Sequence, residues 1–447
     1  MDAGANADFD AAREHFLAGL RAFEAGDMAA AVAAYEASLR LLPGRASTLV
    51  NLAAARLRLG EPAAALTLLD AALAQDPREA DALAHRGEAL AQLGRHAEAV
   101  AACDAALALA TDAASPLRGA LLARRALALL DDGHAAAALR QFDELPGEMA
   151  VSAETTWHRG RALSALDRVA EAERAYRRAV QLQPELGAAW GHLGGLLKDV
   201  GRTDEAADCL RRALALEPDQ PVHRFLLASI EGRDAPPMPP SGYVRGLFDE
   251  YAPSFDDHLV GALEYRAPQW LLRLVQPVLP ADAHSTLTAL DLGCGSGLLG
   301  LCLAPHVAAI DGVDLSPRML ERARSRGVYR QLVEDDVVQH LLGYPGWRTS
   351  PGLIAATDVL IYIGDLAPLF AAVAVALPPG GLFAFSVERA GDDVGYQLRP
   401  TSRYAHSRAY LQRLAASAGL RWRDELAAPL RREQRQAVDG LVVLLQR

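Results

Sequence analysis

Lysine is almost absent from this sequence: Lys198 is the only lysine among 45 basic residues, and the formal net charge of the chain is −11. Residues 1–241 contain 25 basic and 34 acidic side chains, and residues 242–447 contain 20 and 22. Neither part has the surplus of positive charge with which nucleic-acid-binding proteins neutralise phosphates. We therefore expect no nucleic-acid partner.

Cysteine and long apolar runs are also scarce. The four cysteines (Cys103, Cys209, Cys294 and Cys302) form no CxxC pair, so we expect reduced thiols, no disulfide framework and no metal site. No apolar run reaches the ~18 uncharged residues of a membrane span. The acidic start "MDAGANADFD" lacks the basic and apolar segments of a secretory signal. These absences predict a cytoplasmic protein without a membrane partner.

A repeat fills the first half of the chain. The stretch "GDMAAAVAAYEASLRLLP" that begins at Gly26 recurs with the same pattern at Gly60 and Gly94, and again at Asp167 and Gly201. The spacing within each of these two series is 34 residues, and a degenerate copy begins at Gly133. About six repeats therefore cover residues 12–220.

Within each repeat, small residues alternate with larger ones at helical spacing. In the first copy, Ala31 and Ser38 let two helices approach closely, and Tyr35 fills the groove between them. This pattern resembles the tetratricopeptide repeat, which implies a helical solenoid whose concave face binds a protein or peptide. Asn51, Arg86 and His192 fall near the positions of a carboxylate clamp, but for each residue alone the pattern favours a solvated side chain of the groove. The alternative role for the solenoid is to stabilise or dimerise the chain.

A change of composition marks the predicted domain boundary. Residues 231–241 contain four prolines and one glycine, which favour an extended linker. We predict a solenoid with a closing helix over residues 1–230 and a second domain over residues 242–447. Chain length alone also favours two or three domains.

The second domain alternates between strands and helices. We expect strands over 285–293, 306–316, 352–363 and 380–388, a short strand that begins near residue 330, and helices over 317–327, 367–377 and 408–418. Such alternation predicts a parallel sheet covered by helices on both faces. The last two strand-like runs, 421–430 and 440–446, have no room for a crossover helix, so they must pair as an antiparallel hairpin.

The glycine-rich loop "LDLGCGSGLLG" permits two interpretations. Gly295-x-Gly297-x-x-Gly300 has the spacing of a dinucleotide-binding loop, and Gly293-x-Gly295-x-Gly297 has that of a class I methyltransferase. The terminal hairpin favours the second interpretation. The domain then resembles the class I methyltransferases, with a Rossmann-like α/β sheet, and this resemblance implies S-adenosylmethionine as the cofactor.

The resemblance also implies a set of cofactor-binding residues. Asp291 would bind the methionine ammonium, the glycine loop with Cys294 would approach the ligand, and Asp314 would bind the ribose. The adenine would lie near Leu315, Met319 and Val337, with Asp335 or Asp336 accepting from its amino group; one of these two aspartates is equally suited to cap a helix. The cofactor-binding residues expected in the strand-end loops are Asp291, Gly293, Cys294, Gly295, Gly297, Asp314, Leu315, Met319, Asp335, Asp336, Val337 and Asp358.

The stretch over residues 243–268, together with "YIGDL" and "RYAHSRAYL", resembles a bacterial group of predicted methyltransferases that carry N-terminal tetratricopeptide repeats. We expect residues 248–266 to form a lid. In it Phe248, Tyr251, Phe255 and Tyr265 would cover the sulfonium and methyl group, and Arg266 would pair with the methionine carboxylate; the alternative for the aromatic rings is packing of a helix on the sheet. His406 would act as a general base, assisted by Tyr404, because a histidine titrates near neutral pH; the alternative is an exposed residue at the entry of a helix.

The predicted function is methyl transfer to an acceptor that the sequence does not identify. The alternatives are a nicotinamide-dependent oxidoreductase and a non-catalytic scaffold that only binds S-adenosylmethionine. The sequence also leaves the solenoid's partner and the oligomeric state open.

Overall fold

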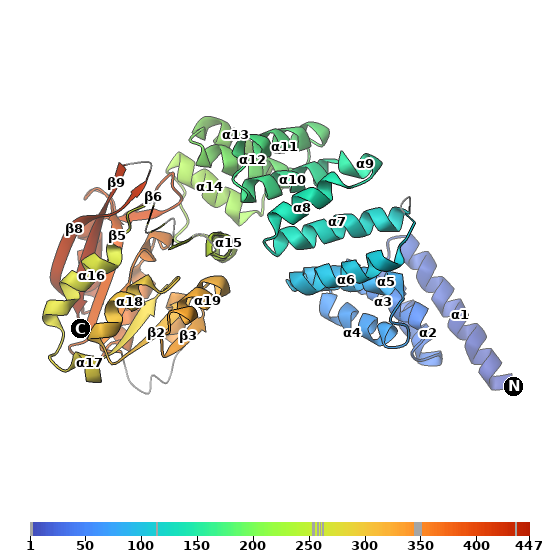
Figure 1. The fold of residues 1–447 in the computed structure, drawn as a ribbon, viewed down its shortest axis with the longest axis horizontal. Helices are drawn as coiled ribbons and strands as arrows, with labels where there is room; N and C mark the ends of the chain where they lie inside the picture. The colour runs from blue at the N-terminus through green and yellow to red at the C-terminus, as the bar shows by residue number, and fades with distance from the viewer. Residues whose placement is uncertain are drawn as a thin grey trace. The chain divides into compact units, whose positions relative to one another are not determined.

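The chain folds into two compact units, Met1–Leu196 and Leu197–Arg447. The computed structural model (Figure 1) describes residues 3–112, 115–252, 255–256, 259, 261, 263–343, 351–433 and 436–447. Each unit is described by itself.

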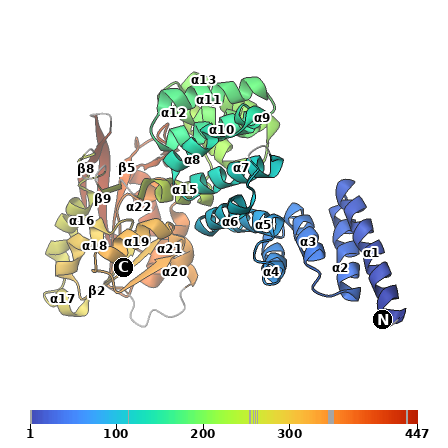
Figure 2. The ribbon, with the colours of Figure 1, turned by 45° about the vertical axis from the view of Figure 1, so that its right-hand side comes forward.

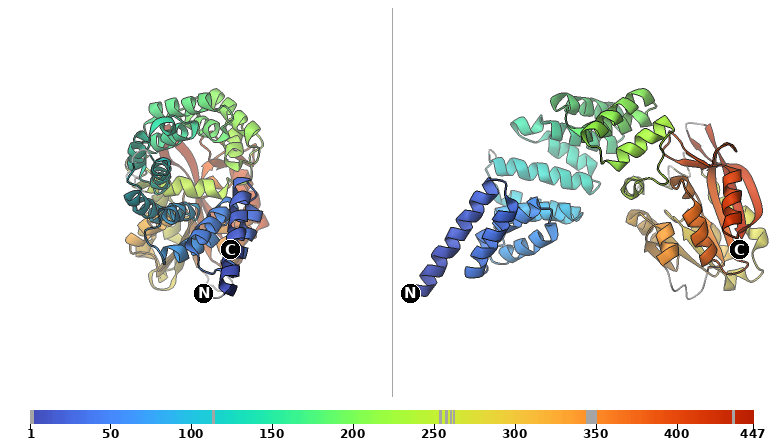
Figure 3. Two further views of the ribbon diagram at one scale, coloured as in Figure 1. Left: turned by 90° about the vertical axis from the view of Figure 1, so that its right-hand side faces the viewer. Right: turned by 180° about the vertical axis from the view of Figure 1, so that it is seen from behind.

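The N-terminal unit is built of antiparallel helix pairs that stack side by side (Figure 3). The first members of the pairs are α1 (Ala3–Glu24), α3 (Ala46–Arg58), α5 (Ala80–Gln92), α7 (Pro116–Asp131) and α10 (Ala153–Ala165). Their partners are α2 (Met28–Leu41), α4 (Pro62–Leu73), α6 (His96–Leu109), α8 (Ala135–Asp143) and α11 (Val169–Leu182). A short helix, α9 (Gly147–Ala150), follows α8, and α12 (Gly187–Asp199) begins the next pair. The predicted all-helical repeat architecture is confirmed.

Glycines on the first helix of a pair allow the close approach that the repeat pattern requires. A Cβ atom on Gly160 would lie 2.5 Å from a ring carbon of Tyr176, and one on Gly19 would lie 2.5 Å from the ring of Tyr35. Both tyrosines are fully buried. The large residue in the second helix therefore packs directly against the backbone of the first helix.

The C-terminal unit includes the last repeat helices. Helices α13 (Thr203–Leu216) and α14 (Pro221–Glu231) lie in it, and Phe225 of α14 packs with the buried Leu398 and Tyr404. The compact units thus divide at Leu196, earlier than the predicted boundary. The predicted ends at residues 230 and 241 remain a prediction about separately folding domains.

The proline-rich linker between α14 and α15 (Ser241–Tyr251) is bonded to the same unit. The Tyr404 hydroxyl donates to the carbonyl oxygen of Pro236 at 2.6 Å, and the amides of Gly364 and Asp365 donate to that of Pro237 at 2.8 and 2.9 Å. The linker therefore packs against the sheet domain, and it does not act only as a spacer.

One mixed sheet organises this unit. Its parallel strands are β1 (Thr288–Leu292), β2 (Ala309–Asp314), β3 (Gln331–Glu334), β4 (Leu353–Ala356) and β5 (Leu382–Arg389), in the spatial order β3-β2-β1-β4-β5. Strand β9 (Gln436–Gln446) pairs antiparallel with β5, and β8 (Arg421–Glu433) pairs antiparallel with β9. The predicted terminal hairpin is confirmed.

Two details of the sheet differ from the prediction. The strand expected over 352–363 ends at Ala356, because Asp358 takes a φ of 56°, outside the β region, and a 3-10 turn follows at Leu360–Tyr362. Two short strands that were not expected, β6 (Tyr396–Leu398) and β7 (Tyr404–His406), pair with each other. Strand β7 also pairs in parallel with the last two residues of β5.

Helices lie on both faces of the sheet (Figures 1 and 2), and the strands direct alternate side chains into the core on each face. Leu290, Ile354 and Phe383 face α20 (Val337–Gly343), α21 (Ala367–Ala376) and α22 (Arg408–Ser417). Ala289 and Leu353 face the cluster of α16 (Ala267–Val275) and α18 (Leu298–Leu303). Helix α19 (Pro317–Ser325) packs on β2 and β3, and α17 (Ala283–Thr286) precedes β1. This arrangement directs the ends of β1, β2 and β4 toward one site.

Candidate functional site

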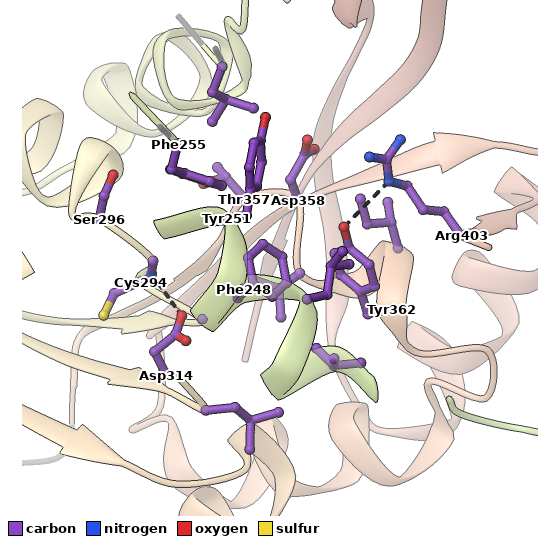
Figure 4. A pocket seen from close by; sticks show the side chains of 18 of the residues that line it. Phe248, Tyr251, Phe255, Cys294, Ser296, Asp314, Thr357, Asp358, Tyr362 and Arg403 are labelled. Atoms are coloured by element: carbon purple, nitrogen blue, oxygen red, sulfur yellow. Dashed lines mark hydrogen bonds between the residues drawn. The ribbon is translucent and has the colours of Figure 1, made fainter. Parts of the chain in front are cut away.

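A cavity of about 820 Å³ lies at the carboxyl ends of the parallel strands (Figure 4). Its size falls within the range of ~300–1,000 Å³ that is typical of small-molecule sites. Of the predicted cofactor-binding residues, the following line it: Tyr251, Gly293, Cys294, Gly295, Asp314, Leu315, Asp336, Val337 and Asp358. Ligands of open α/β sheets bind at this edge of the sheet.

The glycines of the loop after β1 have different surroundings. Gly293, Gly295 and Gly297 have φ values of 62°, 53° and 90°, which residues with a Cβ atom rarely adopt. A Cβ atom on Gly293 would clash with the side chain of Val359, whereas one on Gly295 would meet nothing within 4 Å. Gly295 therefore leaves free space on the wall of the cavity, as close approach of a ligand requires.

The third glycine of the dinucleotide spacing has a packing role. A Cβ atom on Gly300 would clash with the hydroxyl of Tyr329, and the same ring lies 3.0 Å from the position of a Cβ atom on Gly297. The Tyr329 hydroxyl donates to Asp291 at 2.7 Å. Gly300 thus accommodates an internal tyrosine, which explains the dinucleotide-like spacing without a pyrophosphate.

Asp291 lies beneath the loop and does not line the cavity. Its side chain is 1% exposed, and burial raises its pKa to about 7. Gly297 also lies outside the described lining. The structure therefore gives Asp291 a contact with Tyr329, and a direct contact with the methionine ammonium stays a prediction.

Asp314 is fixed at the end of β2. Its carboxylate accepts N–H bonds from Gly295 at 2.8 Å and from Ser316 at 2.9 Å, and burial raises its pKa in spite of these bonds. The carboxylate thus faces the cavity while it also fixes the glycine loop. Met319, expected at the adenine, is fully buried and lies outside the described lining.

The neighbouring residues Asp335 and Asp336 have different positions relative to the cavity. Asp336 lines the cavity and accepts from the amides of Val338 at 2.9 Å and Gln339 at 3.0 Å, so it also caps α20. Asp335 lies outside the described lining and is 3.4 Å from Nδ1 of His340. The helix-cap alternative therefore fits Asp336.

The predicted lid contributes aromatic rings to the cavity. Phe248 and Tyr251 of α15 line it together with Phe255 and Tyr265. The ring of Phe248 meets that of Phe255 edge to face, with centroids 6.2 Å apart. Arg266 does not reach the cavity: it lines a separate hollow with Glu264 and Trp270, so its predicted contact with the methionine carboxylate is not supported. Residues 253–254, 257–258, 260 and 262 of the lid lie outside the described residues.

Acidic side chains hold the lid to the cofactor loop region. Asp249 accepts from the Ser316 hydroxyl at 2.5 Å. Asp256 accepts from the hydroxyl of Ser296 in the glycine loop and pairs with Arg322 at 2.8 Å. Burial opposes ionisation of Asp256, but these hydrogen bonds and the nearby arginines lower its pKa below the ordinary value.

An ion-pair network that the sequence did not reveal forms another wall. Arg431, which is 2% exposed, contacts Asp358 at 2.8 Å through Nη1, Glu433 at 2.7 Å through Nε, and Glu388 through Nη2. Arg403 pairs with the same Glu433. Burial alone would raise the pKa of Glu433, but the two arginines lower it. Arg431 and Asp358 are 73 positions apart in the chain, so no local motif connects them.

Tyr362 and Arg403 also line the cavity (Figure 4), and Nε of Arg403 donates to the Tyr362 hydroxyl at 3.4 Å. Burial tends to lower the pKa of Arg403, but Tyr362 and Glu433 raise it, so the guanidinium stays charged. Tyr362 lies within the quoted "YIGDL" stretch, but no spacing in the sequence indicated its place in the site.

The structure contradicts the predicted general base. His406 is completely buried in β7, outside the described lining, and its Nε2–H donates to the carbonyl oxygens of Ile363 at 2.9 Å and Gly364 at 3.1 Å. Burial lowers its pKa to about 4. Tyr404 is also fully buried and bonded to the linker. Both residues hold structure together, and the alternative of an exposed helix-entry histidine is wrong as well.

The three candidate clamp residues of the N-terminal unit have internal partners. Asn51 donates to the carbonyl oxygen of Ser47 at 2.8 Å, Arg86 contacts Asp70 at 2.9 Å, and His192 Nδ1 lies 2.8 Å from the carbonyl oxygen of Ala188. A carboxylate clamp formed by these three is therefore not supported.

Within the part of the chain that the structure describes, no helix has both the length and the apolar character needed to cross a membrane. No cluster of three or more His, Cys, Asp or Glu side chains there is arranged to hold a metal ion.

Comparison with known families assigns both parts of the chain. Residues 50–116 and 163–230 match models of the tetratricopeptide repeat, and residues 261–427 match a model of a methyltransferase domain.

Individual relatives match over shorter stretches. Human methyltransferase-like protein 27 is 41% identical over 87 residues, which are 19% of this chain and 35% of the relative. The ubiquinone biosynthesis O-methyltransferase of Xylella fastidiosa (strain 9a5c) is 33% identical over 102 residues, 22% of this chain and 42% of the relative. The chain thus spans less than half the length of either relative.

A solved structure is similar to part of the chain. The N-methyltransferase NodS from Bradyrhizobium japonicum WM9, in complex with S-adenosyl-L-homocysteine, is 21% identical, with a TM-score of 0.31, over 40% of this chain and 84% of that one.

The family matches confirm the predicted order of modules, and a methyltransferase domain implies S-adenosylmethionine as its methyl donor. The chain carries tetratricopeptide repeats followed by a class I methyltransferase domain.

Proposed function

We propose that the protein transfers the methyl group of S-adenosylmethionine to an acceptor that binds in the same cavity. The observation that carries the proposal is the open wall at Gly295, which adjoins the carboxylate of Asp314 in a cavity of about 820 Å³. A ligand with a ribose and an adenine fits the donors and acceptors at this edge of the sheet.

The residues present suit the cofactor. Asp314 would accept from the ribose hydroxyls, since each carboxylate oxygen that takes a backbone N–H retains a second lone pair. Leu315 and Val337 would flank the adenine, and Asp336 would accept from its amino group. Bound S-adenosylmethionine supplies a methyl group that is already activated by its sulfonium.

The chain's own contribution to the reaction is positioning and exclusion of water. Phe248, Tyr251 and Phe255 cover the cavity from the lid side, and aromatic faces attract a positive charge. Holding donor and acceptor in line within a dry site lowers the entropic barrier of a displacement.

The alternatives fit the site less well. In a dinucleotide-binding loop the third glycine allows close packing at the pyrophosphate-binding helix, whereas Gly300 makes room for Tyr329. A scaffold that only binds the cofactor would not need the wall of Tyr362 and Arg403, which extends the cavity beyond the residues proposed for the adenosine.

We further propose that the repeats dock a protein or peptide partner. The support is the match of residues 50–116 and 163–230 to repeats of a class that forms extended binding surfaces.

Calorimetry on the full chain tests the proposed function. S-adenosylmethionine and S-adenosylhomocysteine should bind with similar affinity, and NAD should give no heat above dilution. Binding of NAD without a response to S-adenosylhomocysteine would overturn the proposal in favour of the oxidoreductase.

A further inference from the structure

We propose that the methyl acceptor is an amine and that the cavity binds it as a cation. This inference rests on the proposed function and adds the chemical class of the second substrate. Charge, aromatic rings and the distribution of proton-accepting groups on the cavity wall carry it.

The described part of the cavity wall is acidic. Five carboxylates line it against two guanidinium groups, a net formal charge of −3: Asp199, Asp314, Asp336, Asp358 and Glu433 against Arg403 and Arg431. S-adenosylmethionine carries a net charge of about +1 at neutral pH, because its sulfonium and ammonium outweigh one carboxylate. A negative excess therefore remains for the second substrate, and an anionic acceptor would increase it.

The two arginines are engaged by carboxylates. Arg431 directs its three nitrogens to Asp358, Glu388 and Glu433, and it is almost completely buried. Arg403 contacts Glu433 and the Tyr362 hydroxyl. A carboxylate substrate would have to compete with these internal carboxylates and would add a further negative charge to the wall, whereas an ammonium group would reduce the negative excess.

Aromatic rings follow one another along the same cavity. Tyr251 and Phe255 have ring centroids 5.1 Å apart, Phe255 and Phe248 6.2 Å, and Phe248 and Tyr362 5.3 Å, each pair edge to face. Tyr362 lies on the Arg403 side of the cavity and Tyr251 on the lid (Figure 4). The row therefore connects the lid with the opposite wall, and it offers aromatic surface to a positive charge along its length.

Nitrogen methylation conserves the positive charge that such a wall stabilises. The ammonium group binds in the cavity first and then passes one proton to solvent water, which leaves the neutral amine. Its lone pair then forms the N–C bond, the C–S bond breaks, and the electron pair of that bond stays on sulfur. The charge moves from the sulfonium to the methylammonium product, so the aromatic rings and carboxylates stabilise it before and after transfer.

The charges and rings of the cavity wall would stabilise methyl transfer to an anionic oxygen less than transfer to an amine. A phenolate or carboxylate would cancel the sulfonium charge in the transition state and would have to enter a negative cavity. A neutral hydroxyl would need a base to take its proton. The described lining contains no histidine or lysine, its carboxylates Asp358 and Glu433 are paired with Arg431, and burial raises the pKa of Tyr251 and Tyr265, which makes them poorer sources of a phenolate.

Probe binding to the full chain, saturated with S-adenosylhomocysteine, tests the inference. Benzylamine, benzoate and benzyl alcohol have the same ring and differ in charge. We expect benzylamine to bind about tenfold more tightly than benzoate, with benzyl alcohol between them. Calorimetry first establishes binding of S-adenosylhomocysteine, so that a failure of the proposed function is seen separately.

Two matched pairs of variants locate the effect. Tyr362→Leu removes the ring and should weaken benzylamine binding about fivefold, whereas Tyr362→Phe keeps the ring and should stay within about twofold. Asp199→Asn removes an exposed carboxylate of the wall and should weaken benzylamine binding about twofold. Asp392→Asn, an exposed aspartate outside the described lining, should have no effect.

The outcomes separate the two proposals. Binding of S-adenosylhomocysteine with benzoate equal to or tighter than benzylamine overturns the amine inference alone. Equal losses in Tyr362→Leu and Tyr362→Phe also overturn it, because the hydroxyl and not the ring would then matter. No binding of S-adenosylhomocysteine overturns the proposed function and this inference together.

Discussion

The glycines of the loop after β1 have different reasons to be glycine, and each reason predicts a different mutant phenotype. Gly293 lies against Val359, Gly297 and Gly300 lie against Tyr329, and Gly295 faces free space at the cavity. A side chain at Gly293 or Gly300 would thus disturb packing, whereas one at Gly295 would occupy ligand space.

Gly295→Val should abolish binding of S-adenosylhomocysteine, with a loss of at least ~100-fold, while the protein stays folded. Its side chain points into open space, and the cost to stability is confined to the strain of a positive φ, about 1 kcal/mol. Gly293→Ala is the matched variant and should lower the melting temperature, because its Cβ atom meets Val359. Calorimetry and thermal unfolding measure both effects. A Gly295→Val protein that binds normally would contradict the proposed cofactor position.

The buried position of His406 predicts that the free energy of unfolding depends on pH. Its pKa of about 4 in the folded protein lies below the ordinary value of 6.5, so the unfolded chain binds more protons between these values. Its contribution to stability is therefore complete above pH ~6.5 and is lost as the pH falls toward 4. The full loss is roughly 3 kcal/mol if the histidine acts alone.

His406→Gln should reduce the acid sensitivity of the C-terminal unit, since glutamine can donate to the carbonyl oxygens of Ile363 and Gly364 without titrating. Urea unfolding at pH 7 and pH 5 measures the difference, and the exposed His284→Gln serves as the control. Methyl transfer by His406→Gln should stay within a fewfold of wild type. A large loss of turnover with unchanged stability would restore the base hypothesis.

The sequence predicted those site residues that follow strands in short, recognisable motifs. Asp314 and the glycine loop belong to this class, because strand ends of a parallel sheet meet at one edge. Arg431 and Glu388 could not be predicted, since their contact depends on the register between β8, β9 and β5. The burial of His406 could not be predicted from the sequence either, because β7 has only three residues and shows no alternation of apolar and polar side chains.

At the scale of elements, the linker is part of the methyltransferase unit. Its carbonyl groups accept from Tyr404, Gly364 and Asp365, and Met238 and Pro239 line the cavity. Composition predicted an extended proline-rich linker, but a backbone that donates few hydrogen bonds of its own can still accept them from the sheet domain. Such contacts leave no signature in the sequence.

A fragment of residues 242–447 should therefore be less stable than a fragment of residues 197–447, by about 2 kcal/mol or more, because it lacks α13, α14 and the linker bonds. It should also bind benzylamine more weakly, since Asp199, Met238 and Pro239 of the cavity wall are gone. Urea unfolding and calorimetry compare the two fragments. Equal stability would show that the linker contacts contribute nothing.

The ion pairs and hydrogen bonds of Asp256 in the lid predict that the lid slows ligand release. Asp256 joins the lid to Ser296, Arg322 and Arg326, so Asp256→Asn should remove the charge that holds these partners. S-adenosylhomocysteine should dissociate several times faster, with little change in its association rate. Stopped-flow release measures this, and the exposed Asp282→Asn is the control. An unchanged release rate would mean that the lid does not gate the cofactor.

At the scale of the whole molecule, ion pairs connect successive repeats. Arg86 of α5 contacts Asp70 of α4, and the repeat spacing places equivalent pairs at Arg125 with Asp104 and at Arg159 with Asp143. Each pair joins one helix pair to the next. Arg86, the arginine of the predicted clamp, is thus engaged in a contact between repeats, which favours a partner that binds through other surface groups.

The last prediction concerns what the repeats contribute to the reaction. A chain that begins at residue 197 keeps the described cavity wall, including Asp199, so its affinity for S-adenosylhomocysteine should equal that of the full chain. If the repeats dock the acceptor or a protein that carries it, transfer of labelled methyl to the natural acceptor should fall at least ~10-fold at low acceptor concentration, because docking raises the local concentration at the cavity. The assay uses a lysate of source cells that lack the gene, and benzylamine binding, which needs no docking, is the internal control. Unchanged transfer by the shortened chain would reject docking and would leave the solenoid the role of a stabilising or dimerising module.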